Sequence, residues 1–308
     1  MNSLLAAFLF AVLFACGLAV SLLPRRLELA LGRALGRLAM HLAPSRRRVA
    51  EENMRRCLPE LSPKGRARLL RENFEHYGVL ALEILHMFSP ISGHYRRYTA
   101  RVARLEGFEH WKRAADRGKG VLFVSAHLAN WEFAAGAAAL KGIPITITTR
   151  YLKPKWLHRK MEATRLSTGV RALYQPRTLP GVLRALRANE AVTFVMDQYA
   201  PPPMGIWAVF FGAKVHTLAA VGSIAQRTGA AIITAKQRRT PDGIVHIVLE
   251  PEVDLGDAAG DPDKATQILV SRVEKWIREE PSQWLWVHRR FKNAVWPDSA
   301  AAVSSRAS

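Results

Sequence analysis

Cysteine is scarce in this 308-residue chain, which contains only Cys16 and Cys57. The two cysteines lie far apart and in different sequence contexts, so we expect neither a disulfide framework nor a zinc site. A Gly-rich phosphate-binding loop and an internal repeat are also absent from the sequence, so nothing predicts a P-loop nucleotide site or a repeat architecture. We therefore expect no metal ion and no bound cofactor.

Acidic residues are few compared with basic ones. There are 25 Asp and Glu against 45 Lys and Arg, which gives a formal net charge of +20. Such a surplus attracts a polyanion, which can be a nucleic acid, an anionic membrane or a phosphorylated lipid. Because hydrophobic residues make up 49% of the chain, it is not a disordered polyelectrolyte and can bury a large core.

Charge is missing altogether from residues 3–23, which read SLLAAFLFAVLFACGLAVSLL. As a helix this run would be about 31 Å long, close to the thickness of a bilayer's hydrocarbon core. A cleaved signal peptide is the main alternative, but no Lys or Arg precedes the run and it is long for such a peptide. We therefore predict an uncleaved transmembrane anchor at residues 1–24. The apolar run and the lack of RNA-binding motifs favour a membrane over a nucleic acid as the anionic partner.

A basic segment follows the apolar run. Residues 25–71 contain thirteen Arg and Lys against four acidic residues, which by the positive-inside rule places the rest of the chain in the cytoplasm. We predict a basic, helical, membrane-proximal region at residues 25–100. Apolar residues recur at helical spacing from Leu27 to Leu42, as in an amphipathic helix lying on a membrane; a helix packed on the domain would show the same pattern.

Strand-like and helix-like segments alternate after residue 100. This alternation is typical of an α/β fold in which a mainly parallel sheet is flanked by helices. We expect strands at 121–125, 143–149, 192–196, 231–236 and 244–249, and helices at 131–141, 156–167, 179–188, 217–228 and 265–279. The α/β domain is predicted to occupy residues 101–296, followed by a flexible tail at 297–308.

His127 and Glu132 lie in a segment that reads GVLFVSAHLANWEFAAG from Gly120 to Gly136. A histidine next to a carboxylate can act as a general base, because the carboxylate fixes the tautomer and steadies the imidazolium that forms. Positions i and i+5 diverge by about 140° on one helix, so the two side chains meet only if the chain changes direction between them. The apolar run before His127 predicts a strand, and Asn130 is a good N-cap for a following helix.

This reading puts His127 on a strand-to-helix loop and Glu132 in the first helical turn. Ligands bind at such carboxyl ends of strands in open α/β sheets. A core histidine beside an acid that complements the helix dipole explains these two residues equally well.

Six other segments carry motifs that form one pattern with the segment of His127 and Glu132. They are Asn53 with Cys57-Leu58-Pro59-Glu60, Thr149-Arg150, Leu179–Leu186 with Glu190, Met196-Asp197-Gln198, Phe210-Phe211-Gly212 with Thr217, and EPSQWLWVHRRFK from Glu280 to Lys292. Together with the HX4E segment they resemble the late acyltransferases of lipid A biosynthesis, within the wider HX4D/E glycerolipid and lysophospholipid acyltransferase group. The chain departs from that family's pattern at Tyr151 and Met196, where Pro is usual, and at Asn189, where Gly is usual.

The resemblance implies transfer of a fatty acyl chain from acyl-carrier protein to a hydroxyl of a Kdo-bearing lipid A precursor. The enzyme would be a single-pass protein of the bacterial inner membrane with its catalytic domain on the cytoplasmic side. The family's base and its partner carboxylate fall on His127 and Glu132. Its further arginine and aspartate fall on Arg165 and Asp197, and we expect Arg150 to contact the substrate.

Direct transfer fits the residues better than a covalent acyl-enzyme, because no Ser or Cys has an evident activating partner. Ser125, two residues before His127, is the one tempting nucleophile. The same chemistry on a lysophospholipid, an ornithine lipid or a glycolipid is the nearest alternative. A hydrolase and a membrane-binding module without catalysis are more distant ones.

Overall fold

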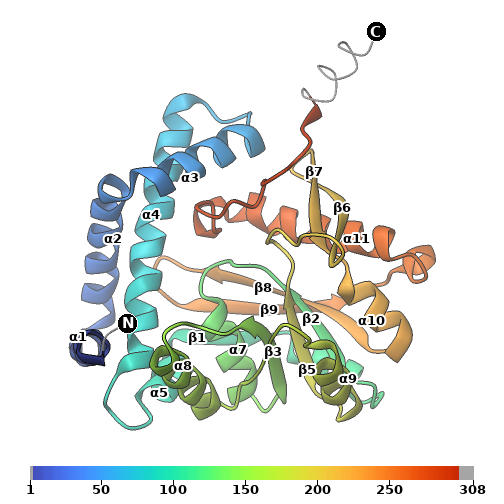
Figure 1. The fold of residues 1–308 in the computed structure, drawn as a ribbon, viewed down its shortest axis with the longest axis horizontal. Coiled ribbons are helices and arrows are strands. Elements are labelled where there is room, and N and C mark those ends of the chain that lie inside the picture. Colours follow the sequence, from blue (N-terminus) through green and yellow to red (C-terminus); the bar gives the residue numbers. More distant parts are fainter. Residues whose placement is uncertain (1–2, 298–308) are drawn as a thin grey trace.

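A seven-stranded sheet forms the centre of the protein, with strand order β1-β9-β8-β2-β5-β3-β4 (Figure 1). The computed structural model describes residues 3–297. Neighbouring strands of the sheet are parallel, except that β8 and β9 are antiparallel. Its strands are β1 (Ala103–Glu106), β2 (Val121–Ser125), β3 (Ile145–Arg150), β4 (Arg171–Gln175), β5 (Ala191–Val195), β8 (Ala231–Arg239) and β9 (Val245–Glu252). The α/β class and the mainly parallel sheet predicted from the sequence are confirmed.

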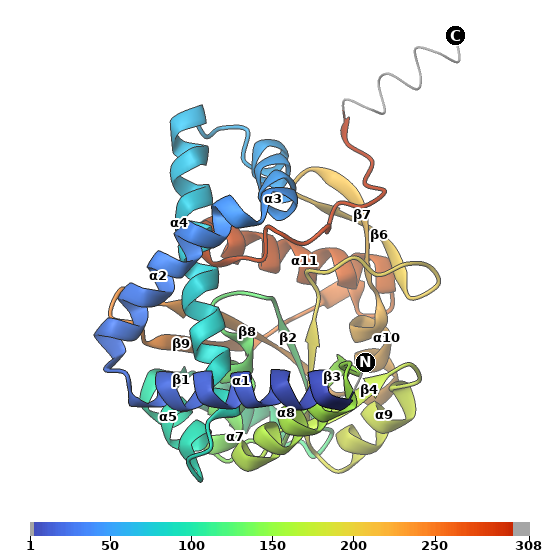
Figure 2. The same ribbon diagram turned by 60° about the vertical axis from the view of Figure 1, so that its left-hand side comes forward.

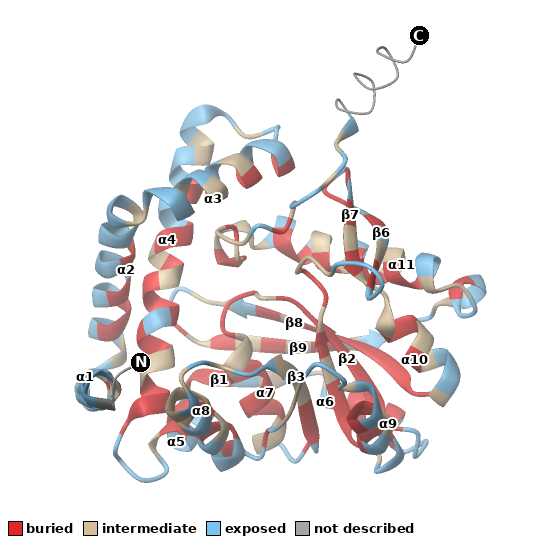
Figure 3. Ribbon diagram, in the orientation of Figure 1, coloured by how far each residue is buried: buried red, intermediate tan, exposed pale blue. Residues whose placement is uncertain are grey.

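Helices accompany this sheet: some cover its two faces, and those nearest the N-terminus pack mainly on other helices. They are α1 (Ser3–Leu22), α2 (Arg25–Leu42), α3 (Pro44–Cys57), α4 (Pro63–Leu85), α5 (His94–Val102), α6 (Phe108–Ala115), α7 (Trp131–Leu140), α8 (Lys155–Thr168), α9 (Leu179–Arg187), α10 (Ala220–Thr228) and α11 (Pro262–Glu279). One hydrophobic cluster packs α6 and α7 against the sheet, and another packs α9, α10 and α11 against the opposite face. Strand β2 is buried at every residue, because helices cover both of its faces (Figure 3).

All five predicted strands are present, and the predicted helices match α7 to α11 within a few residues. The helix expected from residue 217 begins at Ala220, because Thr217 and Leu218 end strand β7. That strand (Ala213–Leu218) pairs with β6 (Gly205–Phe210) in a separate antiparallel hairpin that the sequence analysis missed. Strands β1 and β4 were also missed. Apart from Pro297, the predicted tail lies outside the described residues.

Helix α2 packs closely along α4 through glycines. A Cβ added to Gly78 of α4 would lie 1.9 Å from the carbonyl oxygen of Gly32 and 2.5 Å from the nitrogen of Gly36. The two backbones therefore touch, which only glycine permits. Leu29 is buried in this contact, whereas the leucines on the other side of α2 stay exposed. The sequence left two arrangements open for this helix, one lying on a membrane and one packed on the domain. The structure shows that its glycine side is packed on the domain.

Gly78→Ala should destabilise the protein, because the new methyl group meets backbone atoms that cannot move without separating α2 from α4. We expect a loss of about 1–3 kcal/mol in the free energy of unfolding, as for overpacked sites. Thermal unfolding in detergent, followed by circular dichroism, measures this. Gly65→Ala is the control in the same helix, since its Cβ would meet its nearest heavy atom, Ser62 Oγ, only at 3.3 Å. An unchanged melting temperature for Gly78→Ala would contradict the tight helix contact.

Candidate active site

His127 and Asp197 meet at the carboxyl ends of two neighbouring strands. His127 follows β2 and Asp197 follows β5, and these strands pair in parallel up to Ser125 and Val195. His127 Nδ1 lies 2.8 Å from Asp197 Oδ1, and the backbone N–H of His127 donates to Asp197 Oδ2 at 2.9 Å. The indole Nε1–H of Trp284 donates to the same oxygen at 2.7 Å. Asp197 therefore contacts His127 twice, once at the ring and once at the backbone.

The electrostatics of Asp197 favour its ionised form. Burial opposes ionisation, but the charge of His127 and the hydrogen bonds from His127 and Trp284 outweigh it, so the pKa of Asp197 lies below its ordinary value. An ionised carboxylate only accepts hydrogen bonds, so Nδ1 of His127 must carry a proton. In the neutral ring Nε2 then carries the lone pair, and the side-chain amide nitrogen of Gln198 lies 3.3 Å from it. Nε2 is thus the atom of His127 that can take a proton from a substrate.

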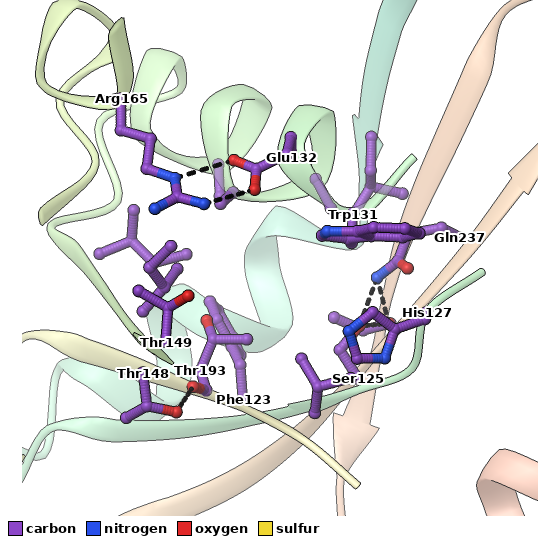
Figure 4. Close-up of a pocket in the computed structure, with 18 of the residues that line it drawn as sticks. Phe123, Ser125, His127, Trp131, Glu132, Thr148, Thr149, Arg165, Thr193 and Gln237 are labelled. Atoms are coloured by element: carbon purple, nitrogen blue, oxygen red, sulfur yellow. Dashed lines mark hydrogen bonds and ion pairs between the residues drawn. The ribbon is translucent and has the colours of Figure 1, made fainter. Parts of the chain in front are cut away.

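Glu132 pairs with Arg165, not with His127 (Figure 4). Arg165 Nε lies 3.0 Å from Glu132 Oε2 and Arg165 Nη2 lies 2.6 Å from Oε1, which makes a two-pronged ion pair between α7 and α8. Burial disfavours the charge of Arg165, but the hydrogen bonds and charge of Glu132 outweigh it and raise the arginine's pKa. The carboxylate that orients His127 in this structure is Asp197, which corrects the pairing expected from the HX4E spacing.

The local path of the chain explains this difference. Helix α7 begins after Asn130, whose Oδ1 accepts from the backbone N–H groups of Glu132 and Phe133, as the N-cap prediction required. The ring of Trp131 then stands edge-on to His127 at 4.8 Å between centroids. Glu132, one residue further along the helix, is directed toward α8. These capped amides are already satisfied, so the guanidinium of Arg165 is the better candidate for stabilising an oxyanion.

Asn130 is itself held by a buried carboxylate. Its side-chain nitrogen donates to Glu83 Oε2 at 2.9 Å. Glu83 is fully buried in α4 and also accepts hydrogen bonds from Arg25 and Arg239. This network fixes the start of α7 from the side of α4 and α2.

A cavity of about 120 Å³ lies between His127 and the Glu132–Arg165 ion pair. His127, Trp131, Glu132 and Arg165 line it toward the carboxyl ends of the strands. The rest is mostly apolar and includes Phe123, Ala135, Ala138, Ile145, Ile247 and Leu249. The site therefore combines a base, an ion pair and an apolar space, which suits a substrate that is polar at one end and hydrocarbon at the other.

Comparison with known proteins agrees with this chemistry. The family model for bacterial lipid A biosynthesis acyltransferases matches residues 3–293. The chain belongs to this acyltransferase family. It is 27% identical over 262 residues to the lipid A biosynthesis lauroyltransferase of Escherichia coli K12, covering 83% of this chain and 82% of the relative. It is 28% identical over 253 residues to the palmitoleoyltransferase of the same organism, covering 80% and 79%.

A third relative is named as an acyltransferase of a different lipid. The phosphatidylinositol mannoside acyltransferase of Mycolicibacterium smegmatis is 26% identical over 211 residues, covering 62% of this chain and 67% of the relative. Relatives at this level of similarity are thus named for more than one lipid.

Two other residues singled out from the sequence lie in different settings. The hydroxyl of Ser125 donates to the carbonyl of Ala235 at 3.0 Å and accepts from the side chain of Gln237. Within residues 3–297 no hydrogen bond joins it to His127, so it has no base to activate it. Arg150 is exposed at the end of β3, 3.3 Å from Gln175 Oε1, and does not line the cavity.

Trp284 and Gln198 contact the pair but were not proposed as site residues. Both belong to motifs quoted in the sequence analysis, so a signal for them was present. Trp284 is buried in the core. Its indole N–H nevertheless reaches Asp197, because an isolated bridge between Leu128 and Trp284 brings the C-terminal segment onto the loop that carries His127.

Arg165→Lys should lower kcat/KM for acyl transfer by about 10²-fold, because a lysine keeps the charge but loses the two-pronged contact by which Glu132 positions the arginine. Arg171→Lys serves as the control. Arg171 also pairs with a glutamate, Glu190, but its own side chain is 56% exposed, and we expect little change there. Steady-state rates with a purified acyl donor and the acceptor lipid measure both. Equal rates for the two variants would show that the two-pronged contact between Arg165 and Glu132 does not contribute to catalysis.

Proposed function

We propose that this enzyme transfers a fatty acyl chain from acyl-carrier protein to a hydroxyl of a Kdo-bearing lipid A precursor. The observation that carries the proposal is the His127–Asp197 pair, whose Nε2 faces a cavity with an apolar interior in a chain of this family. The acyl-carrier protein and the lipid are co-substrates, so the reaction needs no resident cofactor. Within the described residues there is no group of three or more His, Cys, Asp and Glu placed to hold a metal ion.

In the proposed reaction, the oxygen of the acceptor hydroxyl attacks the carbonyl carbon of the thioester. At the same time, His127 Nε2 removes the proton of that hydroxyl. Asp197 keeps the other ring nitrogen protonated and stabilises the imidazolium. Arg165, fixed by Glu132, lies on the cavity wall and stabilises the tetrahedral oxyanion. The C–S bond then breaks, and the departing thiolate takes the proton from His127. The products are the acylated lipid and the free thiol of the carrier.

The apolar part of the cavity is the proposed binding site for the acyl chain. It lies between β2, β3 and α7, where alanines leave space beside larger apolar residues. Hydrocarbon binds such a lining because burial removes apolar surface from water. Direct transfer is favoured because Ser125 is engaged by Ala235 and Gln237.

The proposed location is the cytoplasmic side of the bacterial inner membrane. Helix α1 includes a 19-residue stretch, Leu4–Leu22, that is long and apolar enough to cross a membrane. This stretch and the membership of the acyltransferase family are both compatible with membrane association. The basic residues that follow α1 suit the anionic lipids of the cytoplasmic leaflet. They also suit an anionic lipid acceptor.

A glycolipid acceptor of another pathway is the second candidate. The relative named as a phosphatidylinositol mannoside acyltransferase favours it, since its name gives a mannoside lipid as the acceptor. The HX4E segment and the His–Asp pair are compatible with either acceptor.

Mass spectrometry of reaction products tests the proposal. Membranes that contain the enzyme are incubated with a Kdo-bearing lipid A precursor and a panel of acyl-carrier-protein thioesters. We expect a mass gain equal to one acyl chain, which also identifies the preferred chain length. Folded, membrane-bound enzyme that gives no gain with any donor would exclude the lipid A acceptor, and phosphatidylinositol mannosides, lysophospholipids and ornithine lipids would be tried next. Free fatty acid as the sole product would show a hydrolase.

A further inference from the structure

Helix α1 contacts the domain between Phe10 and Ser21. In its first half, the ring of Phe10 meets Trp156 of α8 edge-on at 5.6 Å. Near its end, Gly17 touches the backbone of Phe88, where an added Cβ would lie 2.6 Å from the carbonyl carbon. Ser21 Oγ donates to Ser89 Oγ at 2.8 Å. These contacts extend over roughly 16 Å of helix axis, so α1 lies across the α5–α8 side of the domain (Figure 2).

The opposite side of α1 is apolar and open to solvent. Phe8 is 64% exposed, Leu18 is 40% exposed and Leu22 is 71% exposed. Soluble proteins rarely leave such a continuous apolar surface uncovered. Something other than water must therefore cover α1 in the cell.

Helix α2 extends this apolar surface. It starts where α1 ends and rises along α4 on the same side of the molecule, as Figures 1 and 2 agree. Its glycine face is buried against α4, so the leucine stripe opposite remains exposed. The leucine stripe consists of Leu27, Leu31, Leu35, Leu38 and Leu42, each at least 40% exposed. We call the outer side of α1 and the leucine stripe together the α1/α2 face.

Cations lie near the α1/α2 face. Arg26, Arg33 and Arg37 share another side of α2, at spacings of seven and four residues, where Arg37 pairs with Glu75 and Arg33 reaches the carbonyl of Pro241. The helices under α1 carry exposed Arg96 and Arg97 on α5 and Lys155 and Arg159 on α8. If α1 crossed the bilayer while keeping its contacts with α8 and η1 (His86–Phe88), these charges would be carried into hydrocarbon, where charged side chains are strongly disfavoured.

We infer that the α1/α2 face lies in one leaflet of an anionic bilayer, with α1 in the plane of the interface and not across the membrane. An apolar face bordered by Arg and Lys is the pattern of an interfacial helix, in which apolar side chains enter the acyl region and cations meet anionic headgroups. This differs from the single-pass anchor predicted from the length of the apolar run. It places α8, which carries Arg165, directly against the membrane-lying helix. The inference does not depend on the proposed reaction.

The position of the N-terminus decides between the two arrangements. A short strand of a split fluorescent protein is fused ahead of Met1 of the full chain, and the complementing fragment is expressed in the cytoplasm. We expect fluorescence comparable to that of the same strand fused after Ser308. Fluorescence from the C-terminal fusion alone would show that α1 crosses the membrane and would overturn the inference.

The leucine stripe is tested by flotation of the purified protein with vesicles of phosphatidylethanolamine and phosphatidylglycerol. Leu31→Glu/Leu35→Glu should lower the vesicle partition coefficient at least about tenfold, because both leucines would lie in the lipid. Ser271→Glu/Lys275→Gln on α11 changes the net charge equally on a surface away from the α1/α2 face and should leave binding almost unchanged. Equal binding of the two variants, with α1 intact in both, would show that α2 does not contact lipid. A solution dimer of the natural chain that the leucine variant dissociates would assign the stripe to a second copy instead.

Discussion

His127→Ala should lower kcat for acyl transfer by at least about 10³-fold and leave the protein folded. The expected effect is large because the acceptor hydroxyl has a pKa far above neutral and attacks a thioester slowly unless a base removes its proton during the attack. His127 Nε2 is directed to the cavity, while its other nitrogen is held by Asp197. Removing the ring leaves the ion pair of Glu132 and Arg165 in place, so binding of the substrates should be retained.

The measurement is the initial rate of product formation by mass spectrometry, together with vesicle flotation and circular dichroism. His110→Ala is the matched control, because His110 lies on α6, away from the cavity, and we expect it to retain full activity. A His127→Ala protein with more than about a tenth of the natural rate would remove His127 from the role of base. Loss of activity together with loss of membrane binding or fold would instead point to a structural role.

The central strands of the sheet can be predicted from the sequence because they contain mostly apolar runs. Strand β2 is buried on both faces, so its residues form an uninterrupted apolar run that local pattern reveals. The edge strands β1 and β4 read ARLE and RALYQ, are short, and are partly exposed. Their strand conformation comes from pairing with β9 and β3, which no local window of sequence contains. The β6–β7 hairpin is different, because its two strands are separated only by Phe211 and Gly212, so a local signal for it was present in the sequence and was missed.

The candidate site was predictable in its members more than in its pairings. His127 and Glu132 follow from a motif six residues long, and Asn130 from the chemistry of helix capping. The distance from His127 to Asp197 depends on the adjacency of β2 and β5, strands that lie about 70 residues apart in the chain. Spacing along the chain suggested Glu132 as the partner because it is near in sequence. In the structure, the turn at Asn130 carries Glu132 past Trp131 toward α8.

Asp197→Asn is expected to lower kcat by about 10³-fold or more, although the side chain changes by a single atom. Two donors, the backbone N–H of His127 and the indole N–H of Trp284, both point at Oδ2 of Asp197. They fix the orientation of an asparagine, whose carbonyl oxygen must take that position. Its NH₂ group then faces Nδ1 of His127, which must become an acceptor. The proton of the ring moves to Nε2, and the base is lost, as for an orienting aspartate replaced by asparagine in a catalytic triad.

Nitrogen-15 chemical shifts of the histidine ring provide a readout that a merely structural defect would not reproduce. We expect the proton on Nδ1 in the natural enzyme and on Nε2 in Asp197→Asn. Asp116→Asn, an exposed site on the far end of α6, is the control and should change neither rate nor tautomer. An unchanged tautomer with an unchanged rate would show that Asp197 does not orient His127.

The same substitution should change how stability depends on pH, and the direction follows from the lowered pKa of Asp197 in the folded state. A carboxyl group whose pKa is lower in the folded than in the unfolded chain stabilises the fold above its unfolded pKa, about 3.9 for aspartate. That contribution is lost as pH falls through the folded pKa. Asparagine has no such group, so the difference in melting temperature between the two proteins should be largest near neutral pH and shrink in acid. A difference in melting temperature that stayed constant from neutral pH to below about pH 3.9 would mean that the Asp197 carboxylate contributes no charge-dependent stability. That result would also contradict the ionised His127–Asp197 pair on which the proposed base depends.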